Sequence, residues 1–334
     1  MVIISDCLIN KKDEGGIKVA SSLAKRLKDR NSAYLISYSE DDFADERVNV
    51  NRSFTNKELY RSISDKSGPI IYIPFSSNSM GGVLRTFFLS KKSKKKVYSL
   101  FVLRHPMDFV KKAILSLSGA KIIALSRESY DYYNDLFNDR VIYLKTGIDT
   151  TKFTPCSLEE KNAIRIKYGY AESDRIVLHV GHLKRGRNVD KLLNISSDYK
   201  VLVLVSSVTQ KDPDLEAQLK KSENIKVIDT YIPNVEEIYK MADVYLFPVE
   251  EARNCIDVPL SVLEAAACNV PVVCTEYGEL KEFRNADGFC FLKDLGSDSL
   301  NKALDKMYHL DNNNRDIVLE YDWSNAVKRL EELD

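Results

Sequence analysis

CIDVPLSVLEAAACNVPVV, residues 255–273, places one carboxylate, that of Glu264, inside an almost wholly apolar run. Pro259 suits the first position of a helix and Asn269 suits the left-handed residue after its end, so the run predicts a short buried helix over residues 259–268. A buried carboxylate loses favourable hydration unless a partner offsets the loss. The sequence therefore predicts that Glu264 accepts hydrogen bonds from hydroxyls and that the free amides at the helix start bind an anion.

The same alternation of apolar runs and helical periods extends along most of the chain and predicts parallel sheets with crossover helices. We expect strands at 2–5, 34–37, 70–74, 97–103, 121–125 and 141–144, then at 176–180, 200–205, 225–228, 244–247 and 271–274. Helices are expected at 17–28, 81–90, 108–116, 127–137, 189–195, 213–221, 235–241 and 259–268. The pattern predicts an α/β protein with two Rossmann-like halves, and residues 150–175 as their linker.

The composition is that of an ordinary globular protein of 334 residues, long enough for two domains. The 49 Lys and Arg balance the 49 Asp and Glu, so the net charge predicts no nucleic-acid partner. Six scattered cysteines without metal-binding spacing indicate reduced thiols and a cytoplasmic protein. The sequence shows neither a signal peptide nor an apolar run long enough to cross a membrane.

Local charge is uneven. Residues 80–121 contain ten Lys and Arg against one acidic residue, Asp108, and apolar side chains are mixed among them. We expect this basic region, residues 81–121, to face an anionic membrane surface, with a solvated helix end as the alternative.

Three further segments carry polar groups to expected strand ends, where open α/β sheets bind ligands. Gly15 and Gly16 open the helix after the first strand, either as an anion-binding turn or as a plain loop. His105 ends the apolar strand before Pro106, and its alternative is a surface histidine. VGHLKRGRNVDKLL, residues 180–193, brings His182, Lys184, Arg185 and Arg187 into one loop that suits a diphosphate or is a solvated basic turn.

Several of these segments together resemble retaining glycosyltransferases of family four, which have the GT-B fold. The resemblance is carried by ADVYLFP (242–248), PLSVLEAAACNVPVV (259–273), VGHLKRG (180–186), the glycine pair, SRESYDYY (126–133), KTGIDTTKFTP (145–155) and a terminal helix that begins DW. It covers nearly the whole chain in the right order. It implies two Rossmann-like domains with mainly parallel sheets facing an interdomain cleft, and a C-terminal helix that crosses back to the N-terminal domain.

The resemblance also implies roles for individual residues. Glu264 resembles the second glutamate of the E-x7-E motif, which holds the ribose hydroxyls, and Arg185 resembles a phosphate-binding lysine. His182 takes the place of an arginine after its strand, and His105 resembles a histidine near the transferred sugar. The start of the apolar helix, formed by Pro259, Leu260 and Ser261, is expected at the diphosphate.

The sequence departs from that family at the first glutamate of the motif, which contacts the sugar, because Ile256 stands there. Asp257 is the neighbouring carboxylate expected to replace it, with Glu250 and Glu251 as further candidates. The glycine loop is also shorter than usual, which leaves the roles of Arg185 and Arg187 interchangeable.

We therefore expect a retaining hexosyltransferase that needs no metal or other cofactor and moves a sugar from a UDP- or GDP-sugar to a hydroxyl of a glycan or glycolipid. The expected domains are an acceptor-binding domain over residues 1–154 with helix 320–334, and a nucleotide-sugar-binding domain over 155–319. Catalytic roles are expected for His105, Arg185 and Asp257. The alternatives are a catalytically degenerate nucleotide-sugar-binding subunit and a sugar-nucleotide epimerase.

Overall fold

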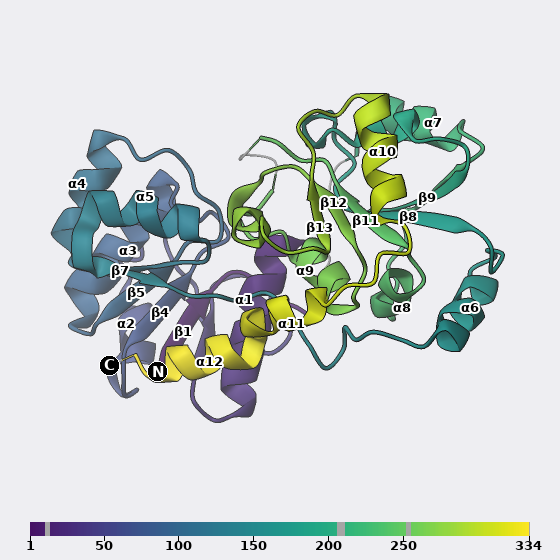
Figure 1. The fold of residues 1–334 in the computed structure, drawn as a ribbon. Coiled ribbons are helices and arrows are strands. Elements are labelled where there is room, and N and C mark those ends of the chain that lie inside the picture. The colour runs from purple at the N-terminus through teal and green to yellow at the C-terminus, as the bar shows by residue number, and fades with distance from the viewer. Residues whose placement is uncertain (11–13, 206–210, 252–254, 334) are drawn as a thin grey trace. The chain divides into compact units, whose positions relative to one another are not determined.

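The computed structural model of the protein describes residues 1–10, 14–205, 211–251 and 255–333, which form two compact units (Figure 1). Unit 1 comprises Met1–Thr146, Ile256–Val258 and Trp323–Asp334, and unit 2 comprises Gly147–Cys255 and Pro259–Asp322. The chain thus enters unit 2 earlier than the expected boundary at residue 154. The segment Ile256–Val258, expected in the second domain, belongs to unit 1.

Unit 1 is built on a parallel sheet of seven strands within the described residues. Their spatial order is β3 (Glu46–Arg47), β2 (Tyr34–Ser37), β1 (Val2–Ser5), β4 (Ile70–Ile73), β5 (Val97–Leu100), β6 (Lys121–Ala124) and β7 (Val141–Tyr143). β1 and β4 are buried throughout, as parallel strands covered on both faces must be.

The helices of unit 1 are α1 (Gly15–Asp29), α2 (Lys57–Ser64), α3 (Met80–Ser93), α4 (Phe109–Ser118), α5 (Arg127–Phe137) and α12 (Trp323–Glu331). Polar side chains begin four of them: Glu14, Ser79, Asp108 and Ser126 each accept a hydrogen bond from an amide of the first turn of α1, α3, α4 and α5, respectively. The C-terminal helix α12 packs against α1 within unit 1.

Unit 2 repeats the architecture, with six parallel strands in its described part. Their order is β10 (Ile225–Ile228), β9 (Tyr199–Val205), β8 (Arg175–Gly181), β11 (Val244–Phe247), β12 (Val272–Cys274) and β13 (Phe289–Phe291). The helices are α6 (Leu158–Lys167), α7 (Pro213–Lys220), α8 (Val235–Lys240), α9 (Leu260–Ala267), α10 (Ser297–Met307) and α11 (Asn314–Val318).

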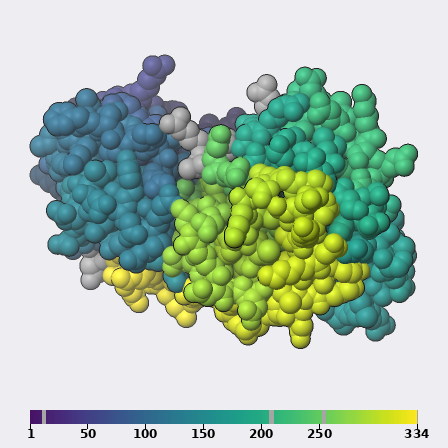
Figure 2. Space-filling model, turned by 45° about the horizontal axis from the view of Figure 1, so that its top comes forward, coloured from purple at the N-terminus to yellow at the C-terminus, as the bar shows by residue number. Residues whose placement is uncertain are grey.

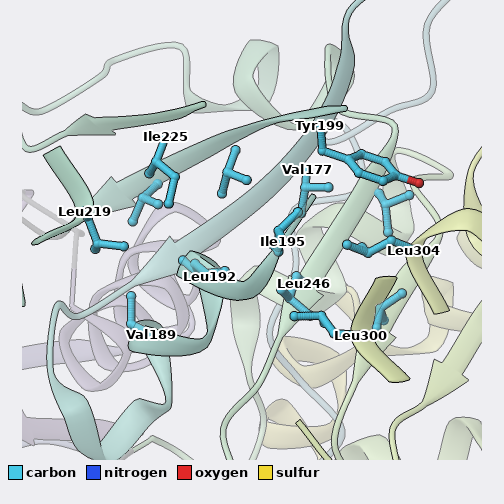
Figure 3. Packing of buried hydrophobic residues seen from close by; sticks show 14 of the residues in the cluster. Val177, Val189, Leu192, Ile195, Tyr199, Leu219, Ile225, Leu246, Leu300 and Leu304 are labelled. Carbon is cyan, nitrogen blue, oxygen red and sulfur yellow. The ribbon is translucent and has the colours of Figure 1, made fainter. Parts of the chain in front are cut away.

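A hydrophobic core of unit 2 lies on one face of this sheet. Figure 3 shows its side chains converging from β8, β9, β11, α7 and α10, among them Val177, Tyr199, Leu246, Leu219 and Leu304. Most of these side chains are fully buried, so the core holds the sheet and its helices as one body and fixes the strand ends.

The observed elements differ from the expected ones in places where tertiary contacts decide. The expected linker 150–175 contains the helix α6, which Ser157 caps and whose Arg165 pairs with the buried Asp243 at 2.7 Å. The expected helix 189–195 is a 3-10 helix, Val189–Asn194. Elements not predicted are α2, α10 and α11, and the strands β3 and β13.

The fold prediction itself is confirmed: the chain forms two Rossmann-like units with parallel sheets. Within the described ranges, no helix combines the length and apolar character needed to cross a membrane.

Candidate functional site

Glu264 lies in the middle of α9, and every residue of this helix except Ser261 is buried. Its carboxylate is 3% exposed, and Oε2 accepts a 2.8 Å hydrogen bond from the hydroxyl of Tyr239, at the C-terminal end of α8. Burial, together with the nearby Glu264, raises the pKa of Tyr239 well above its ordinary value. The hydroxyl therefore stays protonated and donates to Glu264 throughout the physiological pH range.

A second tyrosine connects this carboxylate to the neighbouring strand. The ring of Tyr245, in β11, stacks on Tyr239 with centroids 6.0 Å apart, and its hydroxyl donates a 3.2 Å hydrogen bond to the carbonyl of Val180 in β8. Burial raises the pKa of Tyr245, and a hydrogen bond with the Ser261 side chain opposes this shift. The first turn of α9, Glu264 and the end of β8 are thus close together within unit 2.

The end of β8 holds a buried histidine, His179. Its Nδ1 lies 3.0 Å from the carbonyl of Leu246, so this nitrogen carries the proton and donates it, and Nε2 keeps a lone pair. In the described part of the chain, Nε2 has no hydrogen-bond partner. Burial lowers the pKa of His179 to about 4, so the ring is neutral at physiological pH.

Gly181 allows Arg187 to fold over the end of this strand. A Cβ atom at Gly181 would lie 2.7 Å from Nη1 of Arg187 and 3.3 Å from Nε2 of His179. Any side chain would therefore displace the guanidinium, which is 7% exposed. Gly181, the last residue of β8, is therefore required for the position of Arg187.

The structure distinguishes the two arginines that the sequence left interchangeable. Arg187 is buried beside Gly181, whereas Arg185 is about half exposed and its Nε lies 3.3 Å from Oδ2 of Asp212. Asp212 also caps α7. His182 is half-buried, two residues after Val180. Arg187 is therefore the more firmly positioned cation of this loop.

The apolar helix begins at Leu260, one residue later than expected, with Pro259 as its N-cap. The amides of Val262 and Leu263 are 3.0 and 3.3 Å from the carbonyl of Pro259. No acidic residue lies in the first turn. The positive end of the α9 dipole is therefore not neutralised by a carboxylate of its own first turn.

The carboxylate of Asp257 is hydrogen-bonded within unit 1. Its Oδ2 accepts a hydrogen bond from the hydroxyl of Ser126 at 3.2 Å and another from Ser129, and lies 3.9 Å from Nε of Arg104. Burial raises the pKa of Asp257, and these hydrogen bonds and Arg104 oppose the shift. The carboxylate of Asp257 thus binds the side chains of Ser126 and Ser129 at the start of α5. Its expected contact with a sugar stays a prediction.

Ile256, which stands where the resemblance implies a glutamate, is a packing residue. It is 7% exposed, and a Cβ atom at Gly15 would lie 3.0 Å from its Cδ1. Gly15 begins α1, whose N-cap is Glu14, and the carboxylate of Glu14 accepts a 2.9 Å hydrogen bond from the amide of Ile17. The anion expected beside Gly15 and Gly16 would meet this carboxylate.

His105 is exposed and lies after β5, as expected. Its backbone is held by Asn78, whose Oδ1 accepts from the amide of His105 and whose Nδ2 donates to its carbonyl, both at 2.7 Å. These two bonds fix the main chain while the imidazole lies at the surface.

The structure thus sorts the expected site residues by unit. His182, Arg185, Arg187, Pro259, Leu260, Ser261 and Glu264 belong to unit 2, and Gly15, Gly16, His105 and Asp257 belong to unit 1. Sequence reasoning missed His179, Tyr239 and Tyr245. His179 could have been noticed, because it is the one polar residue of the apolar strand IVLHV.

No group of three or more His, Cys, Asp or Glu side chains suited to a metal ion occurs among the residues that the structure describes.

Two parallel-sheet units of this kind define the GT-B class of fold, and comparisons with known proteins agree. Residues 174–309 match the family model described as glycosyl transferases group 1. A comparison with curated proteins finds no match.

Solved structures resemble the chain over nearly its full length. A glycosyltransferase from Rickettsia africae is 15% identical, with a TM-score of 0.77, over 99% of this chain and 97% of that one. HepE from Anabaena, solved with UDP and glucose, is 13% identical, with a TM-score of 0.74, over 99% and 98%. The N-terminal domain of trehalose-6-phosphate phosphatase from Candida albicans is 11% identical, with a TM-score of 0.66, over 99% and 93%. These likenesses show the fold of the chain, and the family match covers residues 174–309, which lie in unit 2 except for Ile256–Val258.

Proposed function

We propose that the protein is a retaining glycosyltransferase that moves a hexosyl group from a UDP- or GDP-sugar to an acceptor hydroxyl. The observation that carries this proposal is the buried carboxylate of Glu264 on the apolar helix α9, beside an N-terminus without acidic residues. HepE from Anabaena, which shares the fold, has been solved with UDP-glucose. This likeness supports a nucleotide sugar as the donor.

Glu264 is proposed to hold the ribose. A carboxylate repels phosphates but accepts from two adjacent hydroxyls, and hydrogen bonds to a charged group contribute about 1.5–3 kcal/mol each. Tyr239 already donates to Oε2, which orients the carboxylate for a further donor. A ribose therefore adds to the existing hydrogen bond rather than replacing it.

The diphosphate is proposed to bind at the first turn of α9 and at the basic loop after β8. The helix dipole, Arg187 and Arg185 there supply positive charge, which stabilises the negative charge that develops on the leaving group. Because these groups carry the charge, we propose that transfer requires no metal. Addition of a chelator should leave the transfer rate unchanged.

Calorimetric titration with UDP and GDP tests the ribose contact. Glu264→Gln should weaken binding of the preferred nucleotide by roughly 10- to 100-fold. It should change affinity for the 2′,3′-dideoxy analogue far less, since that ligand lacks the hydroxyls. Equal affinity of parent and variant for the ribonucleotide would refute the assignment.

Glu279 offers a matched control in the same unit. It is 1% exposed, and its Oε1 accepts a 2.6 Å hydrogen bond from the hydroxyl of Tyr321, so it repeats the buried pair of Glu264 and Tyr239 elsewhere. Glu279→Gln should lower the free energy of unfolding as Glu264→Gln does, while leaving nucleotide affinity unchanged. The comparison separates loss of a ligand contact from loss of stability.

His105 is proposed to act on the transferred sugar, and the acceptor is proposed to bind unit 1. His105→Ala should lower turnover while keeping nucleoside-diphosphate affinity within a few-fold of the parent. Steady-state transfer assays and titrations on one preparation check both expectations. A large loss of nucleotide affinity, or unchanged turnover, would show that His105 has another role.

The apolar Ile256 favours a second candidate, a nucleotide-sugar-binding subunit without transfer activity. Its side chain packs against Gly15 and offers a sugar no hydrogen bond. Donor hydrolysis or transfer by the isolated chain, above the rate of a Glu264→Ala control, would exclude this candidate.

A further inference from the structure

Helix α4 exposes apolar side chains that most helices would bury. Phe109, Val110 and Leu117 are 85%, 53% and 66% exposed, and only Leu115 and Ser118 of this helix are buried. Successive residues of an α-helix are about 100° apart, so Phe109, Val110 and Leu117 fall within one arc of about 100° that lies away from Leu115. We call these three residues the α4 stripe.

Basic groups surround the C-terminal end of this stripe. The guanidinium of Arg140 donates to the carbonyls of Leu115 and Ser116, both at 3.3 Å. α3 packs against α4, and Ser90 of α3 donates a 2.7 Å hydrogen bond to the carbonyl of Ser118. That contact brings the C-terminal end of α3 beside the end of α4, where Lys91 and Lys94 are exposed, and Lys96 is exposed just before β5. Lys92 points elsewhere, because its Nζ donates a 3.2 Å hydrogen bond to the carbonyl of Thr55.

Further basic residues belong to the same surface. Lys112 is exposed on α4 itself, and Lys121 is exposed at the start of β6. Asp108, the one acidic residue between residues 80 and 121, caps α4, and its Oδ2 lies 3.7 Å from Nζ of Lys111. In Figure 2 the segment around α4, in blue to teal, lies at the surface of unit 1.

We propose that the α4 stripe and its surrounding lysines dock unit 1 on an anionic lipid surface. Apolar side chains on a basic helix face enter the boundary between headgroups and acyl chains, while lysines pair with the phosphates. Protein interfaces are depleted in lysine, so the combination of an exposed stripe with several exposed lysines favours lipid over a protein partner. An isolated apolar patch of this kind on a monomer otherwise costs solubility.

This inference is independent of the proposed donor site, which belongs to unit 2. It deepens the proposed function in one respect: a transferase held at a membrane would meet an acceptor linked to lipid. The experiment below measures only membrane binding. A negative result would therefore not affect the transferase proposal, and a protein without transferase activity could still bind membranes.

Sedimentation with vesicles tests the proposal. The parent chain should pellet with vesicles of phosphatidylcholine and phosphatidylglycerol at low salt, pellet far less with pure phosphatidylcholine, and dissociate at high salt. Phe109→Ser combined with Leu117→Ser should lower the partition coefficient at least 10-fold. Lys112→Glu should lower it by more than about 5-fold, since each lysine near an anionic surface contributes about that factor.

Matched controls come from unit 2. Leu158 and Ile166 of α6 are 72% and 62% exposed, so Leu158→Ser with Ile166→Ser removes similar apolar area elsewhere and should leave pelleting unchanged. Lys200 is exposed on β9, so Lys200→Glu is the matched control for Lys112→Glu and should leave pelleting unchanged. Matching thermal melts of the variants and the parent confirm that the fold is retained.

Three results would overturn the proposal: equal pelleting with neutral and anionic vesicles, no pelleting at all, or an α4 double variant that pellets like the parent. Sedimentation velocity can give a fourth result that overturns it. If the parent is a dimer and the α4 double variant is a monomer, the stripe is an interface between two copies of the chain.

Discussion

The hydroxyl of Tyr239 donates a 2.8 Å hydrogen bond to Oε2 of Glu264, and both side chains are buried in unit 2. A polar pair inside an apolar layer is stable only while each member satisfies the other. The pair therefore has a structural value that exists without any ligand. Variants of the two residues separate that value from a role in nucleotide binding.

Tyr239→Phe should lower the free energy of unfolding by about 1–3 kcal/mol, because a buried carboxylate loses a donor. Nucleoside-diphosphate affinity should stay within a few-fold of the parent, since the carboxylate that accepts from ribose remains. Urea unfolding and calorimetric titration measure the two quantities. If Tyr239→Phe weakens nucleotide binding as much as Glu264→Gln does, then Glu264 acts through the pair rather than as a ribose contact.

Two adjacent glycines at the start of α3 predict opposite outcomes. A Cβ atom at Gly82 would lie 1.9 Å from the carbonyl oxygen of Ser77, so Gly82→Ala requires the backbone to move and should destabilise unit 1 by several kcal/mol. The nearest heavy atom to a Cβ at Gly81 is Oγ of Ser79 at 3.8 Å. Gly81→Ala should therefore be neutral or stabilise the helix by about 0.5–1 kcal/mol. Thermal melts of both variants check the contrast.

The contrast between predicted and missed elements has a physical origin. Fully buried strands such as β1 and β11 carry their own apolar signal, and the sequence predicts them. α6 does not: its burial rests on Ile164 and on the pairing of Arg165 with Asp243, 78 residues away. β13 spans Phe289–Phe291 and its place depends on pairing with β12, which no local pattern encodes.

The candidate site divides in the same way. Glu264 is conspicuous in the sequence because a carboxylate interrupts an apolar run, but its partner Tyr239 lies on another helix and has no local signature. Asp257 looks in sequence like a neighbour of the nucleotide helix. The structure instead assigns it to unit 1, because Ser126 and Ser129 supply hydroxyls that the sequence gives no reason to expect there.

Asp257 should make unit 1 less stable as pH rises. Its pKa in the folded protein is raised by burial, so the folded state holds the proton more tightly than the unfolded chain. Its favourable contribution is present below the ordinary pKa of 3.8 and is lost as pH rises through the higher folded value. Relative to Asp257→Asn, the parent should therefore lose free energy of unfolding as pH rises above about 3.8.

The control is Asp65→Asn, since Asp65 is an exposed carboxylate of the same unit. Urea unfolding over a pH series gives the difference curves, and a parent curve parallel to that of Asp257→Asn would contradict the prediction. Transfer assays on Asp257→Asn at neutral pH also test the predicted sugar contact, which requires a large loss of turnover in a folded protein.

His179 should impose the opposite pH dependence on unit 2. Burial lowers its pKa from 6.5 to about 4. Between these two pH values the imidazole is protonated in the unfolded chain and neutral in the folded protein. The contribution of the neutral ring is complete above pH 6.5 and is lost as pH falls towards 4, by about 3 kcal/mol in total.

His179→Asn keeps a donor for the carbonyl of Leu246 but does not titrate. Its free energy of unfolding should start lower, because the ring is replaced by a smaller side chain, and should fall less steeply over this range. His309, which is exposed, provides the control variant His309→Asn. Equal slopes for the parent and His179→Asn would show that the imidazole accepts its proton without disturbing the strand ends of β8 and β11, and that the site beside Arg187 tolerates a second positive charge.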